Sequence, residues 1–284
     1  MTLGSRSAVR QAAAMRPTPL EEAMDPLRFG GKSAALAQAR AAGLPVPAGW
    51  ALDTALVEAI SAGNPAALAA LQEVRDQLDG LLAVRSSAIG EDAVEQSFAG
   101  QHATYLGVSS GAELQQAVRK IHASARAPAA LAYRSRRGIR GEPRMAVLLQ
   151  KLVPARAAGV LFTCDPISGQ DVLVIEAALG LGEVVVSGEV TPDRFRIDRQ
   201  GRVIERTIGE QEEGLFVVGS AVQKLGLPRS AVPCLDEDSL AALFRMAARL
   251  DQIWPPPHDV EFAFFAGGLA LLQRRPLTVS NAGR

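Results

Sequence analysis

Residues 259–276 read DVEFAFFAGGLALLQRRP, and this stretch decides how the C-terminal part of the chain folds. Two apolar runs flank an Ala-Gly-Gly segment at residues 266–268, a pattern typical of a β-hairpin. The same stretch also carries side chains that are costly to bury without a partner, at Asp259, Glu261, Gln273 and Arg275. These polar groups therefore need either one another or a ligand.

Counting outward from a three-residue loop pairs Glu261 with Gln273 and Asp259 with Arg275. The strand period of two then places all four on one face, at the open end of the hairpin. The other face carries the residues expected in a core, namely Val260, Phe262, Phe264, Ala270 and Leu272. A carboxylate and an amide oxygen suit a hard cation such as Mg²⁺, and an adjacent arginine suits a phosphate. The same residues also fit a second interpretation, a satisfied ion pair between Asp259 and Arg275 at a sheet edge.

The composition of the chain narrows the class of protein. Its 284 residues suffice for one large domain or two lobes. Thirty basic residues balance 30 acidic ones, so the chain has no net positive charge to attract nucleic acid or an anionic membrane. No apolar run approaches the roughly 18 residues of a membrane span. Two isolated cysteines, Cys164 and Cys234, exclude a disulfide framework and a Cys-rich zinc site. We expect a cytoplasmic protein that binds neither nucleic acid nor membranes, with residues 1–19 disordered.

Periodicity and turn residues predict a mixed α/β (α+β) fold that is helical early and richer in strands late. Helices are expected over residues 33–42, within 53–79 with a break near 63–65, over 110–137 and over 237–253. From residue 145 the pattern changes to short apolar strands: MAVLLQKLV, AAGVLFTCDP and DVLVIEAAL. We therefore expect one domain over residues 20–280 with two lobes, about 20–144 and 145–280.

The segment FGGKS at residues 29–33 ends like a P-loop but does not fit that motif. The first glycine of a P-loop would fall on Pro26, and no apolar strand precedes the segment. Two glycines and Lys32 at a helix start can still bind phosphate through backbone amides and an ammonium group. The same segment fits equally well a helix N-terminus with a solvated lysine that has no role in binding.

Two further segments offer groups for phosphate. VRSSAIGED places Arg85 directly after an apolar strand, where a guanidinium can reach a cleft. SFAGQHAT offers Gly100 for close backbone approach to a phosphate and Thr104 as a hydroxyl donor. The nearby serines have no His/Asp partners for a hydrolase, and the three histidines share no metal-ligand spacing.

Five segments occur in order along the chain: GGKSAAL…GLPVPAGW, AVRSSAIGED…SFAGQHATYLGV, LLQKLVPARAAGVLFTCDPISG, ALGLGEVVVSGEVTPDRF and DVEFAFFAGGLALLQRRPLTV. Together they resemble the ATP-grasp nucleotide-binding domain of the phosphoenolpyruvate synthase / pyruvate phosphate dikinase family, which includes the rifampin phosphotransferases. The resemblance runs from about Phe29 to Val279 and implies two lobes with a nucleotide cleft between them. It also implies an enzyme that binds Mg-ATP and sends the β-phosphoryl group to a histidine on a separate swivelling domain, releasing AMP and phosphate.

The resemblance assigns the charged residues by motif position. Lys32 and Arg85 match the residues that hold the triphosphate and neutralise its charge during transfer. Arg275 matches the phosphate arginine of the Q-x-R-P motif. These three residues are therefore the predicted catalytic residues.

The remaining site residues also follow from the resemblance. Gly100 and Thr104 match the loop that closes over the phosphates, and Gln150 in LLQKLV is expected to face the adenine or the ribose. Glu261 and Gln273 match the magnesium-side positions. The implied cofactors are thus ATP and Mg²⁺.

The resemblance stops short of the whole family pattern, because the sequence holds no T-x-G-G-x-x-x-H motif and no C-terminal substrate barrel. The predicted function is the ATP-binding part of a dikinase-type phosphotransferase whose partner protein carries the histidine and the acceptor site. One alternative is a stand-alone ATP-grasp kinase or ligase that acts directly on a small acceptor. A second alternative is a non-catalytic nucleotide-binding regulatory module.

Overall fold

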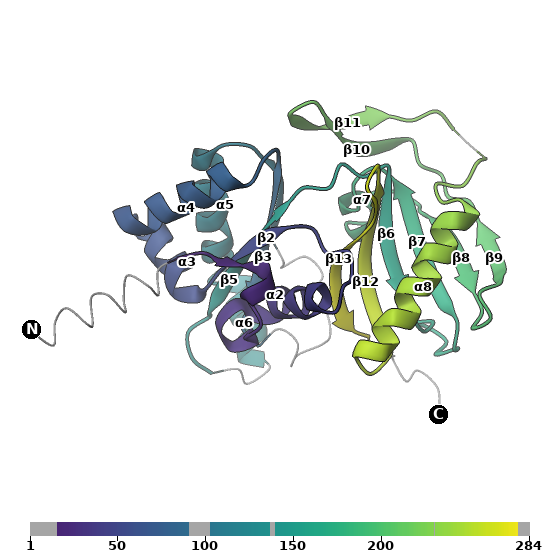
Figure 1. The fold of residues 1–284 in the computed structure, drawn as a ribbon, viewed down its shortest axis with the longest axis horizontal. Coiled ribbons are helices and arrows are strands. Elements are labelled where there is room, and N and C mark those ends of the chain that lie inside the picture. Colours follow the sequence, from purple (N-terminus) through teal and green to yellow (C-terminus); the bar gives the residue numbers. More distant parts are fainter. Residues whose placement is uncertain (1–15, 91–102, 137–139, 230, 278–284) are drawn as a thin grey trace, which may run out of the picture. The chain divides into compact units, whose positions relative to one another are not determined.

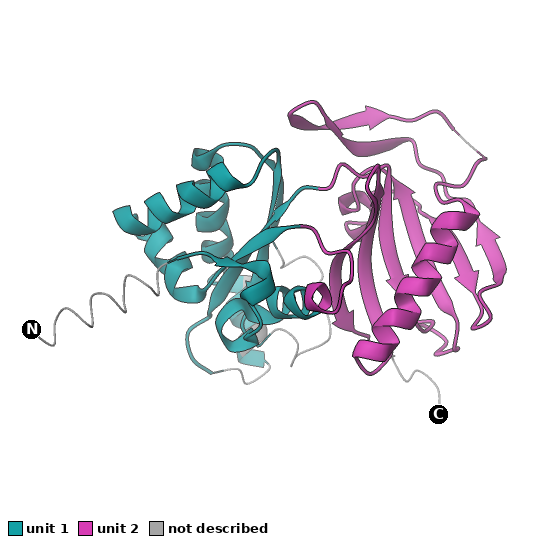
Figure 2. Ribbon diagram, viewed as in Figure 1, with its two compact units in different colours: residues 1–38, 48–152 teal, residues 39–47, 153–284 magenta. Residues whose placement is uncertain are grey.

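A computed structural model of the protein describes residues 16–90, 103–136, 140–229 and 231–277 (Figure 1). The chain divides into two compact units: unit 1 has residues 1–38 and 48–152, and unit 2 has residues 39–47 and 153–284 (Figure 2). The predicted two-lobed α+β class is confirmed. The division differs from the predicted lobe boundary near residue 145, because strand β5 (Met145–Lys151) pairs with strands of unit 1.

Unit 1 is built on an antiparallel sheet with the strand order β1-β2-β5-β3-β4. Its other strands are β1 (Thr18–Pro19), β2 (Gly49–Leu52), β3 (Leu82–Ala88) and β4 (Thr104–Val108). The helices are η1 (Leu20–Glu22), α2 (Pro26–Ala41, which ends in unit 2), α3 (Thr54–Ser61), α4 (Pro65–Gln77), α5 (Gly111–Ser124) and α6 (Pro128–Arg136). The predicted break between α3 and α4 is confirmed, and Asn64 caps α4 there by accepting two backbone N–H groups. Within the described residues no single helix has the length and apolar composition to cross a membrane, and the bent pair α3–α4 meets that criterion only when both helices are taken together.

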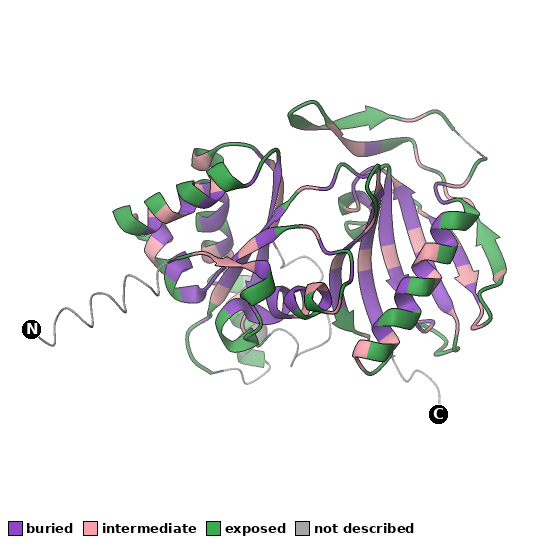
Figure 3. Cartoon of the chain, in the orientation of Figure 1, coloured by how far each residue is buried: buried purple, intermediate pink, exposed green. Residues whose placement is uncertain are grey.

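One face of the unit 1 sheet is covered by helices α3, α4 and α5 (Figure 1). Alternating strand residues such as Leu82, Val84 and Leu149 join the helices in a buried core cluster, which Figure 3 shows as the buried interior of this unit. Because strand side chains alternate between faces, the intervening Arg85 and Ser87 lie on the face that these helices do not cover.

Unit 2 is built on a longer antiparallel sheet with the strand order β13-β12-β6-β7-β8-β9. The strands are β6 (Ala157–Phe162), β7 (Leu173–Leu179), β8 (Asp193–Ile197), β9 (Val203–Thr207), β12 (His258–Phe265) and β13 (Gly268–Pro276). A separate two-stranded sheet joins β10 (Glu213–Val218) to β11 (Ala221–Gly226), and α7 (Glu183–Val186) is a single turn. Helix α8 (Glu237–Ile253) lies along one face of the long sheet (Figure 1). Its bounds confirm the helix predicted over residues 237–253.

The loop of the β12–β13 hairpin is tighter than the sequence suggested. Phe265 pairs with Gly268, so two residues rather than three form the connection. An irregularity next to Phe262 then compensates, because Phe262 pairs with Leu271 and Leu272 is passed over as a bulge. The placement of Ala270 and Leu272 on the face of Phe262 was therefore wrong. Ala270 pairs with Ala263 on the other face, and Leu271 takes the core position, fully buried, whereas Leu272 is only partly buried.

The shorter loop and the bulge cancel in the register. Glu261 pairs with Gln273 and Asp259 pairs with Arg275, as the count along the sequence predicted. The bulge thus brings the polar pairs back into alignment at the open end of the hairpin.

Candidate functional site

The Gly-Gly-Lys segment of unit 1 is held against strand β3 by one serine. The Ser87 hydroxyl donates to the backbone carbonyl of Phe29 (2.8 Å) and accepts the backbone N–H of Ser33 (3.1 Å). Between these two contacts Gly30 has φ 79° and ψ 162°, which interrupts the helical geometry of α2. Lys32, which is 5% exposed, is thereby fixed beside β3.

Gly30→Ala is expected to destabilise the protein and to displace Lys32. A Cβ at this position would lie 2.3 Å from the Ser87 carbonyl oxygen and 2.4 Å from its Oγ, and the positive φ adds strain. We expect a loss of about 1–3 kcal/mol in the free energy of unfolding, measured by denaturant titration. Gly43→Ala is the matched control, because Gly43 has the same φ of 79° but no atom within 4 Å of its Cβ position. Equal losses in the two variants would contradict the close contact between Gly30 and Ser87.

Arg85, Thr104 and Gln150 lie on the sheet face that helices α3–α5 leave open. Arg85 on β3 stands directly opposite Thr104 on β4, and Gln150 on β5 pairs with Ala83, two residues before Arg85. Arg85 is 8% exposed and Gln150 is 2% exposed. The structure therefore gathers these three predicted residues on one face of unit 1, with the Lys32 segment fastened to the same strand. Gly100 lies outside the described residues.

The side-chain amide of Gln150 is buried, and its Nε2 atom has no hydrogen-bond partner among the residues that the structure describes. Gly49, its cross-strand neighbour on β2, makes room for it: a Cβ there would lie 2.4 Å from the Leu149 carbonyl oxygen and 3.1 Å from Gln150 Cγ. An unsatisfied buried donor costs about 1–3 kcal/mol. A ligand acceptor, such as a ring nitrogen of a base or a sugar oxygen, would remove this cost.

In unit 2, the open end of the β12–β13 hairpin carries the other predicted site residues. Glu261 stands opposite Gln273, which is 7% exposed. Next to them Arg275 donates from Nε to Asp259 Oδ2 at 2.7 Å, so the ion pair of the alternative interpretation is present. Its arginine nevertheless keeps 52% of its side chain exposed. Burial raises the pKa of Asp259, with Arg275 opposing this shift and Glu261 adding to it.

Sequence reasoning missed two charged residues on the same face of this sheet, Glu176 on β7 and Arg194 on β8. Cross-strand pairing runs in one line from Gln273 through Glu261, Val160 and Glu176 to Arg194. Glu176 Oε1 lies 3.9 Å from Arg194 Nε, and both side chains are 36% exposed. The alternation of polar and apolar residues in DRFRI was the available signal for Arg194.

The oxygen donors of the hairpin fit a cation that arrives with its own ligands. Within the described part of the chain, no group of three or more His, Cys, Asp or Glu side chains is arranged to hold a metal ion. Glu261 and Gln273 supply two oxygen donors, and Mg²⁺ commonly keeps waters and shares phosphate oxygens instead of entering a full protein cage. This donor set fits Mg²⁺ bound to a polyphosphate.

Behind the hairpin, on the face towards α8, His258 is fully buried. Its Nδ1 accepts a hydrogen bond from Arg274 Nη2 (2.9 Å), and its Nε2 lies 3.3 Å from Asp251 Oδ1 on α8. The Arg274 guanidinium also lies over the Trp254 ring, 4.8 Å from its centroid. Burial, assisted by Arg274, lowers the pKa of His258 to about 4.

We expect the stability of the protein to fall as the pH drops from about 6.5 towards 4. The unfolded chain protonates His258 near the ordinary pKa of 6.5, whereas the folded protein resists until about 4, with Arg274 and Asp251 facing the ring. The unfolded state therefore binds more protons in this window, and the free energy of unfolding decreases by up to about 1.4 kcal/mol per pH unit. Urea unfolding at pH 7 and 4.5 should show a larger loss for the wild type than for His258→Asn. Equal losses would argue against a buried neutral imidazole.

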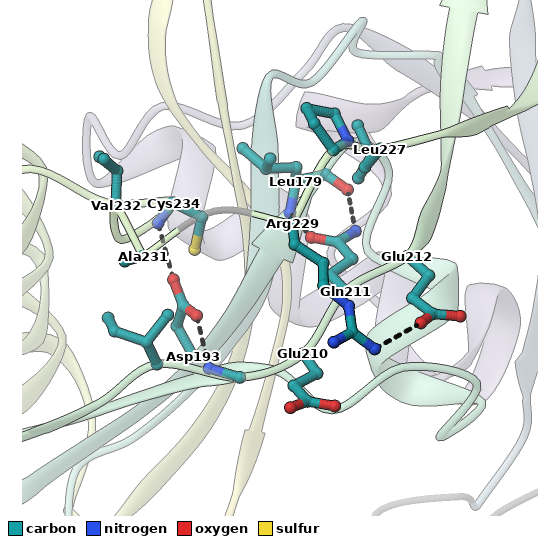
Figure 4. Close-up of a pocket in the computed structure, with 13 residues that line it drawn as sticks. Leu179, Asp193, Glu210, Gln211, Glu212, Leu227, Arg229, Ala231, Val232 and Cys234 are labelled. Carbon is teal, nitrogen blue, oxygen red and sulfur yellow. Dashed lines mark hydrogen bonds and ion pairs between the residues drawn. The ribbon is translucent and has the colours of Figure 1, made fainter.

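A separate pocket of about 240 Å³ lies beside the β10–β11 sheet (Figure 4). Asp193 in its wall accepts the backbone N–H groups of Gly209 (2.9 Å) and Cys234 (2.7 Å). Gln211 is bonded through both amide atoms to the backbone of Leu179. Burial raises the pKa of the Cys234 thiol, which keeps it protonated. These side chains stabilise loops and do not belong to the line of polar residues that begins at Gln273.

Comparison with known proteins gives a family match over most of the chain. Residues 65–284 match the family described as pyruvate phosphate dikinase, AMP/ATP-binding domain. A probable phosphoenolpyruvate synthase of Archaeoglobus fulgidus is 39% identical over 201 residues, which is 69% of this chain and 27% of that protein. A rifampicin phosphotransferase of Streptomyces sviceus is 32% identical over 295 residues, covering 88% of this chain and 34% of that protein. The chain thus spans about a third or less of the length of these relatives.

Among solved structures, a Pyrococcus horikoshii protein is similar with a TM-score of 0.48 and 17% sequence identity. The similarity covers 95% of this chain and 98% of that protein.

Proposed function

Because the chain belongs to the pyruvate phosphate dikinase AMP/ATP-binding domain family, we propose that it binds Mg-ATP and passes the β-phosphoryl group of ATP to a histidine on a partner domain or protein. AMP leaves when the α–β bond is broken, and water cleaves the β–γ bond to release the γ-phosphoryl group as inorganic phosphate. The relatives named phosphoenolpyruvate synthase and rifampicin phosphotransferase support phosphoryl transfer as the reaction class. The final acceptor is set by the partner.

Unit 1 contributes the nucleotide and phosphate contacts in this proposal. The unpartnered Nε2 of Gln150 donates to the adenine or the ribose. Lys32 and Arg85 hold the phosphates, and both are nearly excluded from water, which strengthens their electrostatic effect on developing charge. Thr104, directly opposite Arg85, adds a hydroxyl donor.

Unit 2 contributes the cation contacts, and the pairing of Glu261 with Gln273 is the observation that carries the proposal. A carboxylate and an amide stand side by side on rigid, paired strands, with Arg275 two residues beyond Gln273. Mg²⁺ bound there would neutralise phosphate charge and orient the polyphosphate. Arg275 is placed to add a phosphate contact, because 52% of its side chain is exposed while it bonds Asp259.

The proposal is tested with ATP labelled at the β-phosphate, incubated with the full chain and Mg²⁺. The chain is assayed alone and together with a protein that carries a T-x-G-G-x-x-x-H domain. We expect AMP and an acid-labile, alkali-stable label on the partner histidine only in the mixture. A variant of the partner whose histidine is replaced by alanine is the control.

Two outcomes would overturn the proposal. Rapid AMP formation by the chain alone would favour direct transfer to water or a small acceptor. Absence of Mg-ATP binding at millimolar concentration, measured by calorimetry, would remove the proposed enzymatic function altogether.

A further inference from the structure

We propose that the four residues Asp251, Trp254, His258 and Arg274, called here the back cluster, position the magnesium and phosphate residues of the β12–β13 hairpin. The inference rests on the proposed function and names positioning residues for it. Arg274 follows Gln273 in sequence, and its side chain points to the opposite face of the same strand. The cluster therefore acts through the backbone on the residues beside it.

The cluster is a continuous set of contacts from helix to strand to strand. Arg274 on β13 donates to His258 on β12 through Nη2 (2.9 Å) and Nε (3.3 Å). An arginine can only donate, so Nδ1 must be the accepting nitrogen and the ring proton resides on Nε2. That Nε2 faces Asp251 on α8 at 3.3 Å. Nδ1 is thereby fixed as the acceptor for Arg274, which ties the two strands together. The His258 ring packs against Asp251 of α8 without a hydrogen bond between Nε2 and Oδ1.

The backbone of His258 is fastened as firmly as its side chain. Its N–H donates to Thr163 Oγ1 (2.7 Å), and its carbonyl accepts the N–H of Thr163 (2.9 Å). Arg199 extends the network by donating to the Thr163 carbonyl (2.7 Å) and lying 3.6 Å from Asp251. These contacts extend the pairing of β12 with β6 beyond Asp259, where the ladder between these strands ends.

A positioning role is favoured over simple stabilisation by the chemistry of the cluster. Replacing a buried charged network with apolar residues of similar size is often neutral or stabilising, so bulk stability does not require Arg274 and His258. Directional hydrogen bonds instead select one geometry. The open end of this hairpin holds Glu261 and Gln273, with Arg275 beside them. Mg²⁺ requires nearly ideal octahedral geometry, so its affinity depends on the spacing of the two oxygen donors.

The test compares Arg274→Met, Arg274→Lys and the control Arg202→Met in the full chain. Arg202 is an exposed residue of the β8–β9 connection whose side chain bonds Asp198 and Gln200 nearby. The affinity for a non-hydrolysable ATP analogue is measured by calorimetry across a range of Mg²⁺ concentrations. Amide hydrogen exchange of β12 and β13 is measured without any ligand.

We expect Arg274→Met to raise the Mg²⁺ concentration for half-maximal binding about tenfold, within the range seen when outer-shell partners of metals are lost. Exchange at residues 258–261 and 273–275 should accelerate, with the turn end unchanged. Arg274→Lys keeps a cation over Trp254 and one donor for His258, so it should recover most of the affinity. Arg202→Met should match the wild type.

The inference fails if Arg274→Met folds and its Mg²⁺ dependence and hairpin exchange equal those of the wild type. It also fails if Arg274→Met loses stability but binds the analogue normally once folded. If the wild type itself binds no Mg-nucleotide, the proposed function fails. Unchanged hydrogen exchange in Arg274→Met would then separately reject the positioning of the hairpin by the back cluster.

Discussion

Lys32→Ala and Arg85→Ala are each expected to reduce ATP-dependent phosphoryl transfer by about 10²–10³-fold, the range for losing one preorganised donor to transition-state charge. Both side chains are nearly buried, at 5% and 8% exposure, so water replaces their charge poorly after truncation. The loss should appear in turnover measured as AMP release in the presence of the histidine partner. Binding of Mg-ATP should weaken as well, because both residues contact the phosphates in the ground state.

A matched control separates this effect from a general loss of positive charge. Lys224→Ala removes a lysine of β11 that is half exposed and pairs with Glu213 at 3.0 Å. This variant should retain wild-type turnover, and all three variants should keep the far-ultraviolet circular dichroism of the folded protein. Turnover close to the wild type in either Lys32→Ala or Arg85→Ala would refute the assigned phosphate role.

In the first lobe, the local sequence alone was enough to exclude a P-loop at Lys32. A P-loop needs a strand directly before its glycines, and the structure places the 3₁₀ helix η1 and three residues without regular structure, 23–25, directly before α2. The hydrogen bonds that link Phe29 and Ser33 to Ser87 could not be predicted in the same way. They join residues more than 50 positions apart, and nothing in either segment specifies the other.

The hairpin shows why a correct register can follow from an incorrect loop. Counting from the glycines gave the right polar pairs, although the loop is one residue shorter and Leu272 forms a bulge. Burial explains the agreement. A one-residue slip of β13 against β12 would turn Gln273 and Arg275 towards the core, whereas the bulge keeps them opposite Glu261 and Asp259.

Strands β9 and β11 and the back cluster were outside the reach of sequence patterns. The two strands are short and largely exposed, so they lack the buried apolar runs that marked β5 to β7. His258 follows three prolines, and nothing in that segment indicates a buried imidazole. Its burial depends on contacts from α8 and β13, which only the folded chain supplies.

Glu261→Gln is expected to shift the Mg²⁺ requirement of the protein by at least the roughly 10–100-fold that loss of an outer-shell partner costs a metal site. The amide keeps one oxygen donor and the side-chain volume but removes the negative charge that attracts a hard cation. Turnover at limiting Mg²⁺ should fall by a similar factor, and saturating Mg²⁺ should recover part of it. Titrating AMP release against Mg²⁺ at fixed ATP measures the shift directly.

The direct pairing of Glu261 with Gln273 allows a sharper test than a single variant. Exchanging the two residues, as Glu261→Gln with Gln273→Glu, restores one carboxylate and one amide on the same pair of opposed positions. If the pair acts as one cation site, the double variant should require less Mg²⁺ than either single variant. Glu213→Gln, which removes a carboxylate paired with Lys224, should leave the Mg²⁺ requirement unchanged. An unaltered Mg²⁺ requirement in Glu261→Gln would instead assign this carboxylate to the ordinary polar surface of the sheet.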